Sequence, residues 1–254
     1  MKLNEKEQLI IDSLKRKDVI TNIELSEILQ CSTVTIRSLI RSLEKKGLII
    51  RTHGGAKLCN DYLDIHIPAG NIFKEREAKL RIAEKAYQYI AERDTIILDD
   101  SSNSYYLAQV IKKYSDKYLI IITNSLPVIA ELSTCSAVEI ISIGGVLRGN
   151  KNAFVGDFAI EMLKNFKATK AFIGVHGIDP EFGITSIGNE QMMIKKQIFK
   201  IAQYVYVLTC SEKFGTGYLL VSAPLSQVHK IITDKNIDKN ILNVIKSSVD
   251  IDLV

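Results

Sequence analysis

The chain has 254 residues, of which 46% are apolar and 24% charged, and this composition excludes a disordered or fibrous protein. Its apolar runs are far shorter than the roughly 20 residues of a membrane span, and none follows the basic residue near the start, so we expect neither a membrane segment nor a signal peptide. The four cysteines form no CxxC pair, which indicates reduced thiols in a cytoplasmic protein and argues against disulfides and a zinc site.

The net charge of +4 is concentrated in the first quarter of the chain. Residues 1–57 hold eleven Lys and Arg side chains against seven Asp and Glu, whereas the remaining 197 residues hold 22 of each kind. This asymmetry predicts that the first quarter binds a polyanion and that the rest of the chain does not.

Residues 1–57 are predicted to hold three short helices and a β-hairpin, the layout of a winged helix-turn-helix. Asn22 is the expected cap of the second helix, Ser32 or Thr33 caps the third, and Gly47 ends it. The apolar members of the second helix are Ile23, Leu25, Ile28 and Leu29. The expected elements are helices from Asn4 to about Arg16, over 22–29 and over 33–46, a strand over 48–51, and a hairpin tip at Gly54-Gly55.

The third helix has two distinct faces in the sequence. Ile36, Leu39, Ile40 and Leu43 recur at helical spacing and predict a core face, while hydroxyl and basic residues follow each other at intervals of four on another side. A charge stripe on a helix is often only its solvated face, but the preceding helix and turn and the basic hairpin favour DNA binding. The candidate DNA-contacting residues are Thr33, Thr35, Arg37, Arg41 and Lys45 of the helix and Arg51 and His53 of the hairpin, to which Lys57 adds charge.

Residues 58–75 lack a sustained period and are predicted to be a linker, and residues 76–254 are predicted to form an α/β domain. Helical patterns alternate there with short, nearly continuous apolar runs, which is typical of a mostly parallel, Rossmann-like sheet covered on both faces. The expected helices are 77–93, 105–114, 126–132 and 188–203, and the expected strands are 95–98, 118–122, 138–143, 171–175, 204–208 and 230–233.

Small and polar residues follow most of these strands. Ligands of open α/β sheets bind beyond the carboxyl ends of the strands, where hydroxyls and helix N-termini suit a phosphate, although the same residues also serve in ordinary turns and caps. The pattern predicts a phosphorylated small molecule, with charge from Lys213 and Arg148 and hydroxyl acceptors at Asp99 or Asp100. The candidate ligand residues are Asp99, Asp100, Ser101, Ser102, Asn103, Ser104, Thr123, Asn124, Ser125, Gly144, Gly145, Arg148, Gly177 and Lys213.

Other kinds of site have weak support in the sequence. No dinucleotide fingerprint or GxxxxGK[ST] loop is present, and the four histidines lie far apart, so we expect no cofactor and no metal. A sugar-phosphate isomerase with an appended DNA-binding domain is an alternative, but no base can be assigned to a nucleophile or proton donor from spacing. A DNA-binding protein that ignores small molecules is a third reading.

A set of short motifs runs in order along nearly the whole chain, at 33–37, 43–48, 51–56, 95–99, 123–126, 144–148, 155–156, 171–174, 177–179, 211–215 and 232–234. These motifs resemble those of the DeoR family of bacterial transcription regulators. The resemblance implies a regulator of sugar catabolism, usually a repressor, which is not an enzyme. It also implies a C-terminal domain similar to ribose-5-phosphate isomerase that binds a phosphorylated sugar, and a homodimer or homotetramer that binds two half-sites of operator DNA.

Three stretches depart from the family pattern. Arg37-Ser38-Leu39-Ile40 stands where the family has Arg-Arg-Asp-Leu, which predicts an altered operator. Ser101 and Asn103 replace a glycine and a hydroxyl residue in the first sugar-phosphate loop, and a side chain at 101 is expected to narrow the approach of an anion. Cys210 replaces an acidic residue before Ser211. Together these changes predict an altered effector or a domain that has lost effector binding.

Overall fold

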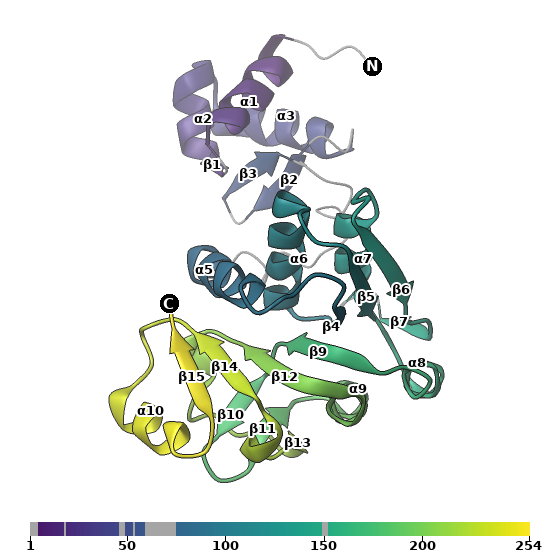
Figure 1. Ribbon diagram of the computed structural model, residues 1–254. Helices are drawn as coiled ribbons and strands as arrows, with labels where there is room; N and C mark the ends of the chain where they lie inside the picture. The colour runs from purple at the N-terminus through teal and green to yellow at the C-terminus, as the bar shows by residue number, and fades with distance from the viewer. Residues whose placement is uncertain (1–4, 18, 46–48, 53, 59–74, 149–151) are drawn as a thin grey trace. The chain divides into compact units, whose positions relative to one another are not determined.

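The computed structural model describes residues 5–17, 19–45, 49–52, 54–58, 75–148 and 152–254. The chain divides into two units, Met1–Ile67 and Pro68–Val254, which are drawn in Figure 1 and described separately below. The boundary between them falls inside the predicted linker, but residues 59–74 of that linker lie outside the described residues. The domain limits at 57 and 76 therefore stay a prediction.

The first unit is a helix-turn-helix followed by a β-hairpin, as the sequence predicts. Strands β2 and β3 form the antiparallel hairpin, and the two-residue β1 pairs with the other edge of β3. Helix α3 packs its Ile36, Ile40 and Leu43 into a core shared with α1 and α2. The bounds are α1 Glu5–Arg16, β1 Ile20–Thr21, α2 Asn22–Leu29, α3 Thr33–Lys45, β2 Ile49–Thr52 and β3 Gly55–Leu58.

The capping of α2 differs from the prediction. Thr21 is the N-cap rather than Asn22, because its Oγ1 accepts the N–H of Glu24 (3.2 Å) while the Glu24 carboxylate accepts the N–H of Thr21 (2.8 Å). Ser32 caps α3, accepting the N–H of Thr35 at 3.2 Å. The predicted end of this helix at Gly47 lies outside the described residues.

The four apolar members of α2 differ in burial. Leu25 and Leu29 pack into the core, whereas Ile23 and Ile28 are exposed. Positions 23 and 28 lie away from the stripe that Leu25 and Leu29 share.

The second unit is built on a seven-stranded sheet in the order β15-β14-β12-β9-β4-β5-β6, with every neighbouring pair parallel (Figure 1). This confirms the mostly parallel α/β sheet. The central register places Ile97 of β4 between Ile122 of β5 and Ala171 of β9. The strands are β4 Thr95–Leu98, β5 Leu119–Thr123, β6 Val138–Ser142, β9 Ala168–Ile173, β12 Ala202–Leu208, β14 Lys230–Thr233 and β15 Asp250–Leu253.

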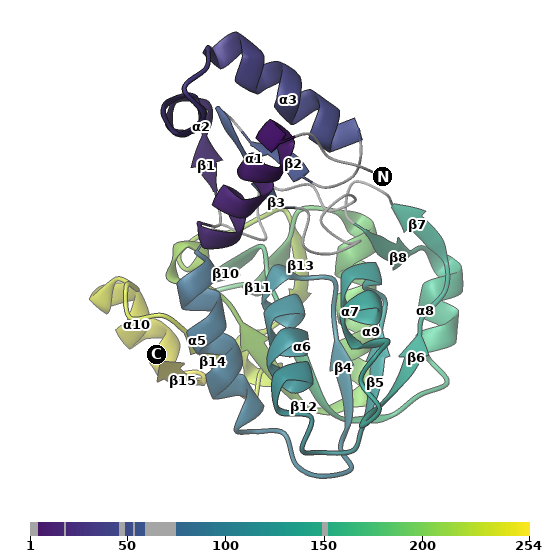
Figure 2. The same cartoon turned by 90° about the horizontal axis from the view of Figure 1, so that it is seen from above.

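Helices cover both faces of this sheet (Figures 1 and 2). Ile96 and Leu98 face a core with α5, α6 and α7, while the intervening Ile97 faces a second core with α8, α9 and α10. Because successive side chains of a strand point to opposite faces, central strands buried on both sides are apolar throughout. The helices are α5 Arg76–Tyr87, α6 Ser102–Tyr114, α7 Leu126–Leu132, α8 Asp157–Leu163, α9 Asn189–Ile201 and α10 Lys239–Lys246.

Several short elements were not predicted, among them α8, α10 and β15. The others belong to two small antiparallel sheets, one of β7 and β8 and one in the order β10-β11-β13. Their bounds are β7 Val146–Arg148, β8 Ala153–Val155, β10 Gly177–Asp179, β11 Gly183–Ser186 and β13 Leu220–Ala223. Among the described residues, no helix combines the length and apolarity needed to cross a membrane, and no cluster of three potential metal ligands occurs.

Candidate nucleic-acid interface and ligand site

The exposed face of α3 carries two basic side chains. Arg37 and Arg41 lie one turn apart and are exposed, because Ile36 and Ile40 beside them turn the opposite side of the helix into the core. Thr35 is exposed and Thr33 is half-buried. The structure therefore presents two arginines on one helical surface, a geometry that suits phosphates and base edges.

The hairpin contributes less charge than predicted. Arg51 on β2 is exposed, and its Nη1 lies 3.7 Å from Oε2 of Glu44 on α3. Lys57 of β3 is buried, so it adds nothing to the exposed basic surface, contrary to the prediction. His53 and the side chain of Lys45 lie outside the described residues.

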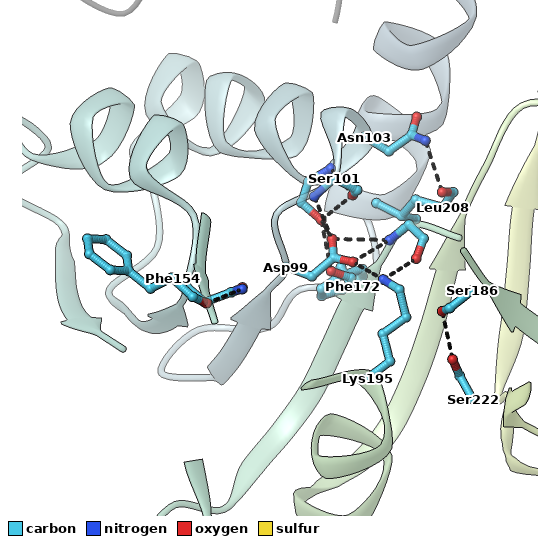
Figure 3. Close-up of polar contacts among 12 residues, drawn as sticks. Asp99, Ser101, Asn103, Phe154, Phe172, Ser186, Lys195, Leu208 and Ser222 are labelled. Carbon is cyan, nitrogen blue, oxygen red and sulfur yellow. Dashed lines mark hydrogen bonds and ion pairs between the residues drawn. The ribbon is translucent and has the colours of Figure 1, made fainter. Parts of the chain in front are cut away.

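A buried charged network lies where β4 ends in the second unit (Figure 3). Asp99 is fully buried, and its Oδ2 lies 2.6 Å from Nζ of Lys195 on α9. The N–H of Gly174, directly after β9, donates to both carboxylate oxygens (3.1 and 3.0 Å), and the Ser104 hydroxyl donates to Oδ1 at 2.6 Å. The N–H of Ser101 also reaches Oδ1, at 3.1 Å. These five contacts occupy the carboxylate from every side.

The pKa of Asp99 lies below its ordinary value. Burial by itself raises it, but the charge and hydrogen bond of Lys195 and the bonds from Ser101 and Ser104 outweigh burial. Asp99 is thus a buried anion with protein partners, which account for its place in the fold. Ser104 is fully buried between Asp99 and the carbonyl of Phe172, and the ligand contacts predicted for these two residues stay predictions.

Lys195 was not predicted as a site residue. It is buried and donates to the carbonyl of Gly174 (2.7 Å) as well as to Asp99. The available signal was its place between Met192 and Ile198, which puts one lysine on the apolar, inward side of α9. Read that way, the lysine requires a buried anion, because a charged amine is costly to bury alone.

Ser101 directs its side chain into the protein. Its Oγ accepts the N–H of Ser104 (3.2 Å) as the N-cap of α6, and Gly174 is so close that a Cβ there would lie 2.3 Å from Ser101 Cβ. The expectation that this side chain narrows the approach of an anion is corrected: the hydroxyl faces inward. Ser102, the first residue of α6, is half-buried.

Asp100 differs sharply from its neighbour. It is half-buried, and desolvation together with the charge of Asp99 raises its pKa above the ordinary value, although Lys195 and a hydrogen bond with Gln191 act in the other direction. Gln191 belongs to the first turn of α9, so Asp100 lies between the starts of α6 and α9. A carboxyl held towards its neutral form can donate as well as accept a hydrogen bond.

The polar residues after β5 serve the fold rather than an open site. Thr123, Asn124 and Ser125 are all buried. Thr123 Oγ1 accepts the N–H of Ser125, Asn124 Nδ2 donates to the carbonyl of Phe154 in β8 (3.0 Å), and Ser125 caps α7. These contacts are turn and cap chemistry, and the ligand role predicted for the three residues stays a prediction.

Asn103 also has an internal partner. Its Nδ2 donates to the carbonyl of Leu208 at the end of β12 (3.0 Å), which fixes the first turn of α6 against that strand (Figure 3). The side chain is buried, and its Oδ1 has no hydrogen-bond partner. Asn103 is thus placed at the same edge as Asp100, with one acceptor unused.

The predicted residues in and just before β7 are exposed, whereas Ala153 and Val155 of its partner strand β8 are buried. Gly144, Gly145 and Arg148 are exposed. The Arg148 guanidinium pairs with the Glu190 carboxylate in the first turn of α9 through Nη2–Oε1 (2.7 Å) and Nε–Oε1 (3.2 Å), so its charge is already partnered. Gly177 on β10 is buried, and a Cβ there would lie 2.2 Å from the carbonyl oxygen of Thr216, so close packing explains that glycine.

Lys213 lies in the short helix after β12 and is half-buried, with its Nζ 3.0 Å from Oε1 of Glu212.

Cys210 directly precedes this short helix. Burial raises the pKa of its thiol to about 11, although the neighbouring Lys79 lowers it, so Cys210 is a neutral thiol. Asp234 after β14 accepts the N–H of Ser211 at 2.8 Å, which holds this loop in place. Asp100 and Ser102 follow β4, and Lys213 follows β12, which is separated from β4 in the sheet by β9, so the three residues lie at the same carboxyl edge but not after adjacent strands.

Known proteins share both units of this chain. The family model of the DeoR-like helix-turn-helix domain matches residues 6–61, and that of the DeoR C-terminal sensor domain matches residues 74–235. A solved D-ribose-5-phosphate isomerase in complex with phospho-erythronic acid is 18% identical and covers 57% of this chain and 56% of its own, with a TM-score of 0.41.

Curated relatives extend over almost the whole chain. The transcriptional repressor GlcR of Bacillus subtilis is 32% identical and covers 89% of this chain and 86% of its own length. The L-fucose operon activator of Haemophilus influenzae is 30% identical over 94% of this chain and 95% of its own length, and a putative aga operon repressor of Escherichia coli O157:H7 is 28% identical over 99% and 94%. The chain belongs to the DeoR family of DNA-binding transcriptional regulators.

Proposed function

We propose that this protein is a sequence-specific repressor of a carbohydrate-catabolism operon, and that a phosphorylated sugar bound to the second unit modulates its binding to operator DNA. The observation that supports DNA binding is the surface formed by the exposed Arg37 and Arg41 on one helix of a helix-turn-helix. The relatives include the transcriptional repressor GlcR, a putative repressor of the aga operon and an activator of the L-fucose operon, and the repressor role is the one we propose here.

The proposed sugar-phosphate site lies at the carboxyl edge of the large sheet. The start of the 13-residue helix α6 offers backbone N–H groups at Ser102 and Asn103 beside the Ser102 hydroxyl, and Lys213 supplies positive charge near this edge. Asp100 and the free Oδ1 of Asn103 provide hydrogen-bonding partners for sugar hydroxyls. In this proposal Asp99 and Lys195 do not contact the ligand, and Asp99 holds the start of α6 in place through its hydrogen bonds with Ser101 and Ser104.

The proposal assigns no catalysis to the second unit. Acid–base chemistry on a sugar needs a carboxylate that reaches the substrate. Asp99 is occupied by five protein contacts, and we assign Asp100, whose pKa is raised by burial and by the charge of Asp99, to hydrogen bonding rather than to acid–base catalysis. We further propose a homodimer or homotetramer, because two copies of α3 are needed to bind two half-sites of an operator.

DNA binding is tested with the full chain and a duplex obtained by selection from a random library. We expect Arg37→Ala and Arg41→Ala each to weaken binding by roughly 5- to 150-fold, the range of one good arginine contact, and to lower the salt dependence. Arg81→Ala, an exposed arginine on α5, is the matched control. Unchanged affinity in both α3 variants would refute this interface.

Effector binding is tested by thermal shift against a panel of sugar phosphates. Inorganic phosphate and the matching unphosphorylated sugars serve as controls. A ligand at 100 times its Kd stabilises the folded state by about 2.7 kcal/mol, which raises Tm by a few degrees. The same compounds should change operator affinity. A panel without any shift would leave a DNA-binding regulator that has lost effector binding, the alternative that Cys210 suggests.

A further inference from the structure

Val34 lies on the outward face of α3. Its side chain is 72% exposed, although valine is apolar and its neighbours on this helix surface are polar or basic. At 3.6 residues per turn, Val34, Ser38 and Arg41 fall on the side opposite the buried Ile36 and Ile40. Val34 is therefore part of the same surface as Arg41, about two turns nearer the start of the helix.

In the first turn of α3, Val34 and Thr35 are both exposed, and Val34 is the apolar one of the two. The Thr35 hydroxyl is held 3.0 Å from the hydroxyl of the N-cap Ser32, and Thr33 is half-buried. Residues at the start of a helix-turn-helix recognition helix contact base edges in the major groove, while residues further along contact the backbone. An apolar side chain placed there cannot contribute a hydrogen bond, so any contribution to recognition comes from apolar contact.

Thymine is the base that offers such a contact. Its 5-methyl group projects into the major groove, whereas the other three bases present only hydrogen-bonding atoms there. We propose that Val34 packs against the 5-methyl group of a thymine and so determines the base preferred at one position of each operator half-site. This inference rests on the proposed DNA binding and adds to it the residue and the chemical group that specify a base.

The test removes the methyl groups of the two proposed partners, the thymine and Val34, one at a time. An operator is selected from a random duplex library with the full-length protein, and each thymine of one half-site is then replaced in turn by deoxyuridine, which lacks only the 5-methyl group. We expect one of these replacements, at the thymine that Val34 contacts, to weaken binding of the wild-type protein about fourfold relative to the unmodified operator. This ratio follows from ~0.8 kcal/mol per buried methyl-sized group. Val34→Ala should bind the thymine operator several-fold more weakly and show no further loss with deoxyuridine there.

Val244→Ala provides the matched control, since Val244 is 55% exposed on α10 of the second unit. It should retain the wild-type thymine-to-deoxyuridine ratio at every position. Alanine is a better helix former than valine, so loss of helix α3 does not explain an effect of Val34→Ala. Equal thymine-to-deoxyuridine ratios for wild type and Val34→Ala at every position would overturn this inference while leaving DNA binding intact. Failure of the wild-type protein to select or bind any duplex would instead overturn the proposed function.

Discussion

Nζ of Lys195 lies 2.6 Å from Oδ2 of Asp99, and both side chains are buried. The two residues are 96 positions apart in the sequence. Lys195 belongs to α9, which covers one face of the sheet, while Asp99 bonds to Ser104 in the first turn of α6, which covers the other face. The pair, drawn in Figure 3, therefore connects the two helical layers at the carboxyl edge of the sheet, where we also propose the effector site.

Removing Lys195 should strongly destabilise the second unit. In Lys195→Met the Asp99 carboxylate stays buried without its charged partner, and breaking a buried pair in this way costs about 3–5 kcal/mol. We expect a loss of this size in the free energy of unfolding measured with urea at pH 7. Lys196→Met removes the exposed neighbouring lysine of the same helix and should change stability by less than about 0.5 kcal/mol.

The same pair predicts acid sensitivity with a definite sign. Because the folded state lowers the pKa of Asp99, the stabilisation is present above the unfolded value of about 3.9 and is lost as the pH falls through the folded-state value. Lys195→Met should lack this loss. Equal urea stabilities of Lys195→Met and Lys196→Met at pH 7 would contradict a structural role for the pair.

Asp100 should show the opposite pH behaviour. Its raised pKa means that the folded state favours the protonated carboxyl, so ionisation costs stability above the unfolded value of about 3.9, fully so above the folded-state value. Asp100→Asn keeps a neutral side chain and should therefore increase the free energy of unfolding at pH 7. The gain should vanish below the unfolded pKa. A variant that is less stable than wild type at pH 7 would show that the charged form of Asp100 is the one that the fold favours.

Ser101 should act on α6 rather than against an effector. Ser101→Ala removes the cap and should cost about 0.5–2 kcal/mol in the free energy of unfolding, whereas Ser101→Gly should cost only a few tenths. Ser101→Gly also restores the glycine that the family has here. Because the hydroxyl faces inward, effector-induced thermal shifts should be the same for Ser101→Gly and wild type. A larger shift in Ser101→Gly would mean that the side chain does restrict the ligand.

The sequence predicts those parts of the fold that a regular spacing of apolar residues encodes. The core face of α3 and the central strands of the sheet follow from spacing alone, because each buries a continuous apolar surface. The strands of the two small antiparallel sheets have only three or four residues and depend on tertiary pairing, so no local period reveals them. The helix predicted over 77–93 ends at Tyr87, because a turn follows in which Arg93 has a positive φ of 64°.

The candidate ligand residues were harder to separate from structural ones. Ser and Asn after a strand serve equally as caps and as ligand contacts, and only the three-dimensional bonds of Asn124 and Ser125 distinguish the two uses. Lys195 was missed because its partner lies far away in the sequence, although a lysine on an apolar helix face was visible. The proposed site is accordingly smaller than the predicted one.

Lys213 and Ser102 are the strongest tests of that smaller site. Lys213→Ala removes the nearby positive charge, and Ser102→Ala removes one hydroxyl at the start of α6 while leaving its backbone N–H groups in place. Each should weaken the effect of a sugar phosphate on operator affinity, Lys213→Ala more strongly because it removes a charge-assisted bond worth about 1.5–3 kcal/mol. Affinity for DNA without effector should stay at the wild-type value, since neither residue belongs to the first unit. Lys200→Ala, an exposed lysine on α9, is the matched control, and titrations of Lys213→Ala that overlay those of Lys200→Ala would place the effector elsewhere.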